Sequence, residues 1–129
     1  MTLKGHCLCR DVTFELQGDH NWVGHCHCDS CRRSTGAPLV TFIGHPNGQW
    51  QWTGKTPTVY ESSLGNAWCF CPRCGSSVAY MSTRFPNEIH FHATLLEDPK
   101  NLKPSEIYHA DERLPWMPNA LPGCANDIF

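Results

Sequence analysis

The sequence predicts an all-β protein built from short antiparallel strands. Ten glycines and ten prolines are spread so evenly over the 129 residues that no stretch free of both exceeds 12 residues. Because either residue weakens or ends a helix, long helices are excluded. The stretches between these breaks are rich in β-branched and aromatic residues, which suit a pleated surface. The chain is long enough for one domain with its own core.

Alternation of apolar and polar residues identifies the strands. Over Asp11–Leu16 the side chains of Val12, Phe14 and Leu16 fall on one face, which we expect to be buried. The last 30 residues hold four prolines, so we expect turns there and one short helix around Ser105–Ala110. Glycine, proline and asparagine clusters bound the further expected strands, which are Pro38–Ile43, Gln49–Thr53, Val59–Ser62, Asn66–Cys71, Ser77–Ser82 and Glu88–Thr94.

Charge and hydropathy exclude several classes of protein. The formal net charge is −2 at pH 7 and the sequence pI is about 6.4, so no basic field attracts nucleic acid or an anionic membrane. No apolar run approaches the roughly 20 residues that cross a bilayer. The first residues lack the apolar stretch of a secretory signal. We therefore expect a cytoplasmic protein without nucleic-acid or membrane partners, of open oligomeric state.

Nine cysteines are the most informative feature of the composition. A disulfide framework fits them poorly, because the count is odd, no export signal precedes them and neighbouring cysteines would close only short loops. Ligation of metal ions by thiolates is the favoured interpretation. Cys124 stands alone, and the others form three groups: Cys7 and Cys9; Cys26, Cys28 and Cys31; and Cys69, Cys71 and Cys74.

Two of these groups predict a closed structural zinc site. Cys71 and Cys74 form a C-x-x-C knuckle with a proline inside it and Gly75 after it, which provides two ligands. Cys7 and Cys9 can supply the other two, because alternate positions of an extended chain face the same way. Four thiolates would saturate a zinc ion and tie the two halves of the chain together.

The remaining group predicts a second, more open zinc site. Cys26, Cys28 and Cys31 offer three sulfurs, and three protein ligands with one vacant position are typical of a reactive zinc centre. The alternative is a second structural site, closed by a fourth ligand: Cys69, Cys124, His25 or His27. A thioredoxin-like redox pair is less favoured, because no βαβ pattern surrounds it.

The motifs together resemble the glutathione-dependent formaldehyde-activating enzyme (GFA/CENP-V) family. The resemblance runs from about Leu3 to about Gly123 and implies one GFA-like zinc-binding domain over residues 1–129, with the small all-β fold called a β-tent. It implies a structural zinc on Cys7, Cys9, Cys71 and Cys74 and a second, labile or catalytic zinc on Cys26, Cys28 and Cys31. The segments that carry it are Gly5–Cys9, His25–Pro38, Phe70–Ser76, Arg84–Ile89, Arg113–Trp116 and Leu121–Pro122.

The chemistry of a three-thiolate zinc site agrees with the activation of formaldehyde by a thiol, which the family name implies. Such a site carries a net charge of −1, so it is a weak Lewis acid, yet it can bind an incoming thiol as the thiolate. A thiolate is the nucleophile that adds to an aldehyde carbon. We therefore expect a carbon–sulfur lyase acting on adducts of a small thiol and a small aldehyde, which the family resemblance implies are glutathione and formaldehyde. The alternatives are a non-catalytic zinc module that binds a protein partner, and a thiol or zinc sensor.

Three residues are candidates for substrate binding. Arg32 and Arg33 follow the open cysteine group, and a guanidinium binds carboxylates such as those of glutathione; a solvated or structurally paired arginine is the alternative. Trp116 lies in the family's C-terminal motif, where it forms either a pocket wall or part of the core. The chain has Asn119-Ala120 where relatives often carry Asp-Gly, so a carboxylate that could shape the pocket is absent.

Three histidines carry further expectations. His27 lies between two expected ligands, and we expect it at the surface rather than in proton transfer. His90 and His92 share a strand face with Glu88, opposite Ile89 and Phe91. A solvent-facing polar strand face is favoured there over a two-histidine metal site.

Overall fold

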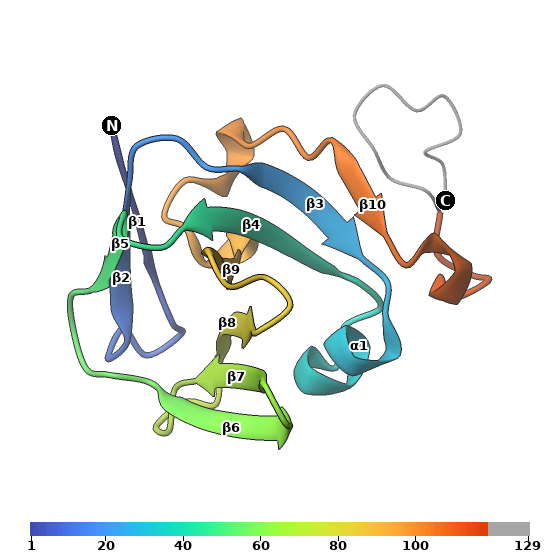
Figure 1. Ribbon diagram of the computed structural model, residues 1–129, viewed down its shortest axis with the longest axis horizontal. Coiled ribbons are helices and arrows are strands. Elements are labelled where there is room, and N and C mark those ends of the chain that lie inside the picture. Colours follow the sequence, from blue (N-terminus) through green and yellow to red (C-terminus); the bar gives the residue numbers. More distant parts are fainter. Residues whose placement is uncertain (119–129) are drawn as a thin grey trace.

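The computed structural model describes residues 1–118, which form two β-sheets and one α-helix (Figure 1). The predicted all-β class is confirmed. The smaller sheet has the order β1-β2-β5 and the larger has the order β10-β3-β4-β9-β8-β7-β6. All pairs are antiparallel except β10 and β3, which run parallel. The small sheet holds β1 (Thr2–His6), β2 (Thr13–Gln17) and β5 (Trp50–Trp52).

One helix and three 3₁₀ turns lie between or after the strands of the larger sheet along the chain. The helix α1 (Asp29–Thr35) connects β3 to β4, and the 3₁₀ turns are η1 (Ala93–Leu95), η2 (Pro99–Asn101) and η3 (Ala110–Glu112). The strands of this sheet, in chain order, are β3 (Trp22–Cys26), β4 (Val40–Pro46), β6 (Thr58–Ser63), β7 (Asn66–Phe70), β8 (Ser77–Ser82), β9 (Glu88–His92) and β10 (Glu106–Tyr108).

The predicted strands are present, with ends that shift by a few residues, but besides the 3₁₀ turns four elements of residues 1–118 were not predicted. Three are the strands β1, β3 and β10, and the fourth is helix α1. The short helix expected around Ser105–Ala110 is wrong: this segment holds β10, which pairs with β3 and not with a sequence neighbour. The Ser105 backbone N–H donates to the Val23 carbonyl at 3.0 Å, so tertiary pairing overrides the local preference.

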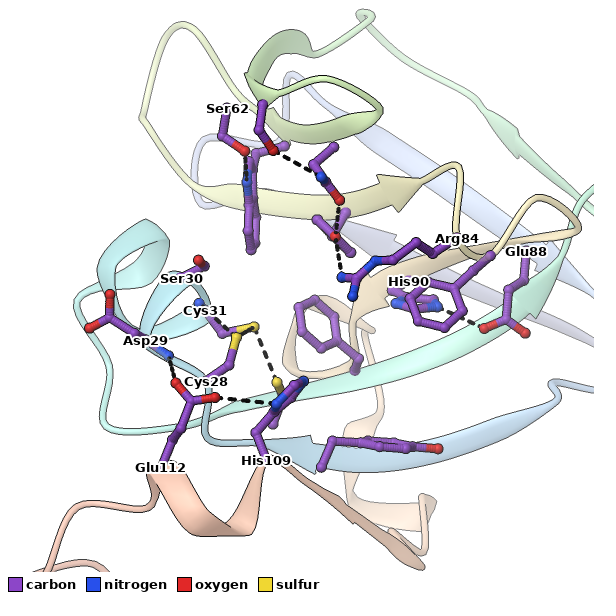
Figure 2. Close-up of a pocket in the computed structure, with 18 of the residues that line it drawn as sticks. Cys28, Asp29, Ser30, Cys31, Ser62, Arg84, Glu88, His90, His109 and Glu112 are labelled. Carbon is purple, nitrogen blue, oxygen red and sulfur yellow. Dashed lines mark hydrogen bonds and ion pairs between the residues drawn. The ribbon is translucent and has the colours of Figure 1, made fainter.

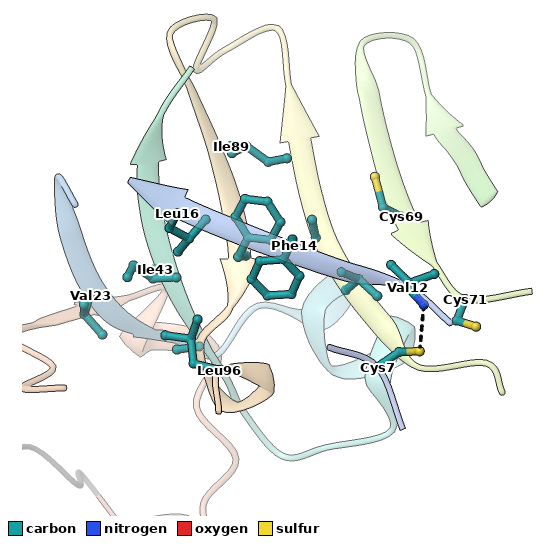
Figure 3. Close-up of a cluster of buried hydrophobic side chains, with 14 residues drawn as sticks. Cys7, Val12, Phe14, Leu16, Val23, Ile43, Cys69, Cys71, Ile89 and Leu96 are labelled. Atoms are coloured by element: carbon teal, nitrogen blue, oxygen red, sulfur yellow. Dashed lines mark hydrogen bonds between the residues drawn. The ribbon is translucent and has the colours of Figure 1, made fainter. Parts of the chain in front are cut away.

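The main core lies between the two sheets (Figure 3). As expected, Phe14 and Leu16 of β2 are buried together with Val12, which directly precedes the strand, and each is at most 1% exposed. Phe14 stacks on Phe91 of β9, with ring centroids 4.4 Å apart. One face of the large sheet is therefore covered by the small sheet.

The opposite face of the large sheet buries the two histidines of β9. His90 is 7% and His92 5% exposed, so the expected solvent-facing strand face is wrong. Both rings lie against Phe42 of β4, with centroids 5.9 and 5.0 Å away. The strand alternates as predicted, but its second face is covered by a second apolar cluster, formed by Cys26, Cys31, Val40, Phe42 and Trp68.

Candidate metal centres and cleft

The sulfur atoms of Cys7, Cys9, Cys71 and Cys74 all lie within 4.8 Å of one another. We call this group the quartet. We expected Cys7 and Cys9 to lie at alternate positions of an extended chain, and this expectation is wrong. They lie in a turn after β1 in which the Arg10 backbone N–H donates to the Cys7 carbonyl at 3.1 Å and Arg10 has a φ of 71°. The turn, rather than strand alternation, points the two sulfurs the same way.

The quartet fits a zinc ion. The Cys7–Cys9 and Cys9–Cys71 sulfur separations are 3.6 and 3.7 Å. A zinc–sulfur distance of about 2.3 Å places tetrahedral sulfurs about 3.8 Å apart. The backbone N–H groups of Val12 and Cys74 donate to the sulfurs of Cys7 and Cys71 at 3.3 and 3.5 Å and help to hold them in place.

The sulfurs of Cys26, Cys28 and Cys31 form a second group, which we call the trio. Cys26 ends β3, Cys28 caps the N-terminus of α1 and Cys31 lies in the first turn of that helix. The Cys28–Cys31 and Cys31–Cys26 sulfur separations are 3.0 and 3.3 Å, and the Cys31 backbone N–H donates to the Cys28 sulfur at 3.3 Å. The three sulfurs converge as zinc ligands do, although a bound ion would hold them somewhat farther apart.

Within residues 1–118, no fourth His, Cys, Asp or Glu joins the trio. His27, one of the alternatives for a fourth ligand, lies outside the trio. It is only 1% exposed, so the expected surface position of His27 is wrong. Cys69 is 1% exposed in the main core, where burial raises the pKa of its thiol to about 11. His25 bonds with Thr41 at 2.8 Å, and Cys124 lies outside the described residues.

The trio opens onto a cleft of about 630 Å³, whereas none of the quartet cysteines lines it (Figure 2). The cleft lies on the face of the large sheet opposite the main core, and helix α1, β10 and η3 form parts of its wall. Its walls include six aromatic side chains: Trp22, Phe42, Trp68, Tyr80, Phe85 and Tyr108.

Near the trio, Glu112 holds the wall formed by η3 against the helix. Its carboxylate accepts from the Asp29 backbone N–H at 3.0 Å and lies 3.2 Å from His109 Nδ1. Tyr108 is paired with Cys26 across β10 and β3, and its carbonyl accepts from the His27 N–H at 3.1 Å. The segment after β10 is thereby fixed beside the trio, a contact that no pattern in the sequence indicates.

A second carboxylate in the cleft, that of Glu88, is surrounded by donors. It accepts from Asn21 Nδ2 at 3.0 Å, Trp22 Nε1 at 2.9 Å and His90 Nε2 at 2.7 Å. Burial alone would raise the pKa of Glu88, but these hydrogen bonds outweigh it and lower that pKa. Burial lowers the pKa of His90, and Glu88 offsets this only in part. At neutral pH an ionised Glu88 therefore faces a neutral His90.

The candidate substrate-binding residues lie outside this cleft. The Arg33 Nε is 3.0 Å from an Asp29 carboxylate oxygen, and Arg32 donates to the His27 carbonyl at 3.2 Å. Trp116 is 68% exposed. Their roles in binding stay a prediction, while Arg84, which the sequence did not single out for binding, lines the cleft.

Fold and site together define a class: a small β-sheet protein with a four-cysteine cluster away from the cleft and a three-cysteine cluster that opens onto it, each able to take a metal ion. The model of the family described as glutathione-dependent formaldehyde-activating enzyme matches residues 2–111. The chain belongs to this family, as its motifs had indicated.

Individual relatives are distant. A Halomonas elongata protein provisionally named a glutathione-dependent formaldehyde-activating enzyme is 22% identical, over 91% of this chain and 80% of its own. A Schizosaccharomyces pombe protein named an uncharacterised lyase is 26% identical, over 77% of this chain and 72% of its own. A crystal structure of a Rhodobacter sphaeroides protein has the same fold, with a TM-score of 0.62 at 22% identity over 81% of this chain and 98% of its own.

No helix within residues 1–118 is long and apolar enough to span a bilayer.

Proposed function

We propose that the protein is a zinc-dependent carbon–sulfur lyase that forms or cleaves the adduct of a small thiol, such as glutathione, and a small aldehyde, such as formaldehyde. The observation that carries the proposal is the difference between the two clusters. The quartet brings four sulfurs together away from the cleft, while the trio has three and opens onto it. Membership of the family and the names of the two relatives support the same reaction class.

In this proposal the quartet holds a structural zinc ion and the trio holds a second, catalytic one. An ion at the trio supplies the affinity for an incoming thiol and favours its thiolate form. The thiol gives up its proton to solvent, the sulfur lone pair forms the bond to the aldehyde carbon, the carbonyl π electrons move to oxygen, and that oxygen takes up a proton from solvent in place of the one released. Cleavage is the reverse: the hydroxyl loses its proton, the C=O bond forms again and the C–S electron pair returns to sulfur.

In this proposal the protein side chains orient the reactants. The aromatic walls offer apolar surface beside the trio, and Glu112 fixes His109 at the edge of the cleft. The substrate-binding residues proposed from the sequence lie outside the cleft and are Arg32, Arg33 and Trp116. We also propose that residues 1–129 form a single zinc-binding domain that works in the reducing cytoplasm. The eight cysteines of the described chain are unbridged, the state that both centres need.

The proposal is tested by following ¹³C-formaldehyde exchange with its thiol adduct by NMR. The zinc-loaded protein is mixed with glutathione, cysteine or 2-mercaptoethanol in turn. We expect the wild type to accelerate the exchange with at least one thiol. Cys28→Ser should lose this acceleration and also lose one of the two zinc ions per chain. Cys69→Ala is the matched control, because it also removes a thiol but lies outside both clusters. If the wild type accelerates no exchange, the protein is instead a zinc module or sensor, and release of zinc by glutathione identifies the sensor.

A further inference from the structure

One cationic side chain in the cleft has no acidic partner within residues 1–118. Arg84 lies in the turn between β8 and β9, and Figure 2 shows its side chain extending into the cleft. Its guanidinium lies 5.5 Å from the centroid of the Phe85 ring, and its Nη2 is 3.5 Å from the Tyr80 hydroxyl. Neither contact neutralises the charge. In the described part of the chain, no other arginine or lysine lines the cleft and no carboxylate pairs with Arg84.

The three acidic residues of the cleft are each engaged elsewhere. Asp29 pairs with Arg33 at 3.0 Å, and Glu112 accepts from the Asp29 backbone N–H and lies within hydrogen-bonding distance of His109. Glu88 already accepts three hydrogen bonds. None of them pairs with Arg84, so its fork of N–H donors is available to a ligand.

Arg84 and the trio lie apart within one cleft. The trio belongs to β3 and α1, Arg84 to the turn between β8 and β9, and Figure 2 shows Arg84 across the cleft from Cys28 and Cys31. The six aromatic residues line the same cleft. A ligand that reaches both ends therefore presents sulfur at one end, an anion at the other and flat or apolar groups between them.

We infer that Arg84 binds a carboxylate of the substrate, which is a thiol or thiol adduct with a carboxylate remote from its sulfur. The inference rests on the proposed function for the sulfur end of the ligand. A guanidinium pairs with a carboxylate through two parallel hydrogen bonds, which a neutral thiol or an ester cannot reproduce. Arg84 thereby selects among thiols, while the trio provides the reactive end.

Binding of a probe without a free thiol tests Arg84 separately from catalysis. The zinc-loaded protein is titrated with S-methylglutathione and with its dimethyl ester, and tryptophan fluorescence is followed because Trp22 and Trp68 line the cleft. We expect the acid to bind more tightly than the ester. Arg84→Gln should weaken binding of the acid about tenfold and leave that of the ester unchanged. Arg84→Lys should fall between, since it keeps the charge and loses the fork.

Two further variants complete the comparison. Lys4→Gln removes a positive charge from β1, outside the cleft, and should bind both probes as the wild type does. The inference is overturned if Arg84→Gln binds the acid normally, if acid and ester weaken equally, if the wild type binds neither probe, or if only Arg33→Gln loses affinity for the acid. Binding of the acid through Arg84 without accelerated formaldehyde exchange would preserve the anion site and reject the proposed reaction.

Discussion

His92 is a buried imidazole whose Nε2 has no hydrogen-bond partner within residues 1–118. Burial lowers its pKa to about 4, well below the value near 6.5 expected for the unfolded chain. Between these two values the unfolded chain takes up a proton that the folded protein does not. The contribution of His92 to stability is therefore present above pH 6.5 and is lost as the pH falls toward 4.

We predict that His92→Leu makes stability less dependent on pH. Leucine fills a similar volume in the apolar cluster and cannot take up a proton. Between pH 7 and pH 5 the free energy of unfolding should fall by about 2 kcal/mol less in the variant than in the wild type. Urea unfolding at several pH values measures this. Loss of metal in acid is common to both proteins and cancels in the comparison, so equal pH dependence would contradict the prediction.

At the scale of residues, the sequence predicted which groups of cysteines converge but not the remainder of the cleft. Close spacing restricts where sulfurs can lie, so C-x-C and C-x-x-C are informative without a fold. Arg84 and Glu112 carry no such signal. The contact of Glu112 with Asp29 joins residues 83 positions apart, and only the pairing of β10 with β3 brings them together.

At the scale of elements, the parallel pairing of β10 with β3 depends on a glycine. A Cβ built on Gly24 would lie 2.9 Å from the Glu106 Cβ and 2.9 Å from the Tyr108 ring. Side chains at this position would therefore push β10 away. Because β10 precedes His109 and Glu112, the same close approach holds one wall of the cleft in place.

We predict that Gly24→Val displaces β10 while the two sheets remain folded. The variant should lose about 1–3 kcal/mol of stability through overpacking. It should exchange the amide hydrogens of β10 rapidly and bind S-methylglutathione more weakly. Hydrogen exchange and the fluorescence titration measure these effects. Thr58→Val, which places the same side chain on the exposed strand β6, should change neither, and a protected β10 in Gly24→Val would contradict the prediction.

The sequence predicted the strands whose alternation is clear and failed for elements defined by tertiary contacts. Strand β8 was predicted with its observed bounds, because its apolar run lies between clear turn signals. Helix α1 has only seven residues, too few for a helical period, and its N-cap is a cysteine. Strand β10 has three residues and pairs across a long connection, so no local pattern could predict it.

At the scale of the whole molecule, the quartet joins turns from both sheets. Cys7 and Cys9 follow β1 of the small sheet, while Cys71 and Cys74 lie between β7 and β8 of the large one. Around them the Leu8 backbone N–H donates to the Ser76 hydroxyl at 3.0 Å. Arg73 Nη1 also lies 3.3 Å from an Asp11 carboxylate oxygen, and both of these contacts are at the surface. A metal ion at the quartet would therefore be the strongest single link between the two turns. The trio, in contrast, lies within the β3–α1 connection.

This difference predicts opposite outcomes for two cysteine-to-serine variants. A structural zinc ion contributes on the order of 10 kcal/mol to folding, comparable to the whole stability of a domain. Cys71→Ser should therefore give an unfolded or insoluble protein, whereas Cys28→Ser should remain folded with one zinc ion per chain in place of two. Circular dichroism and zinc analysis of the purified variants measure both outcomes. Cys71→Ser folded at normal yield, or global unfolding of Cys28→Ser, would show that stability does not depend on the quartet as we infer.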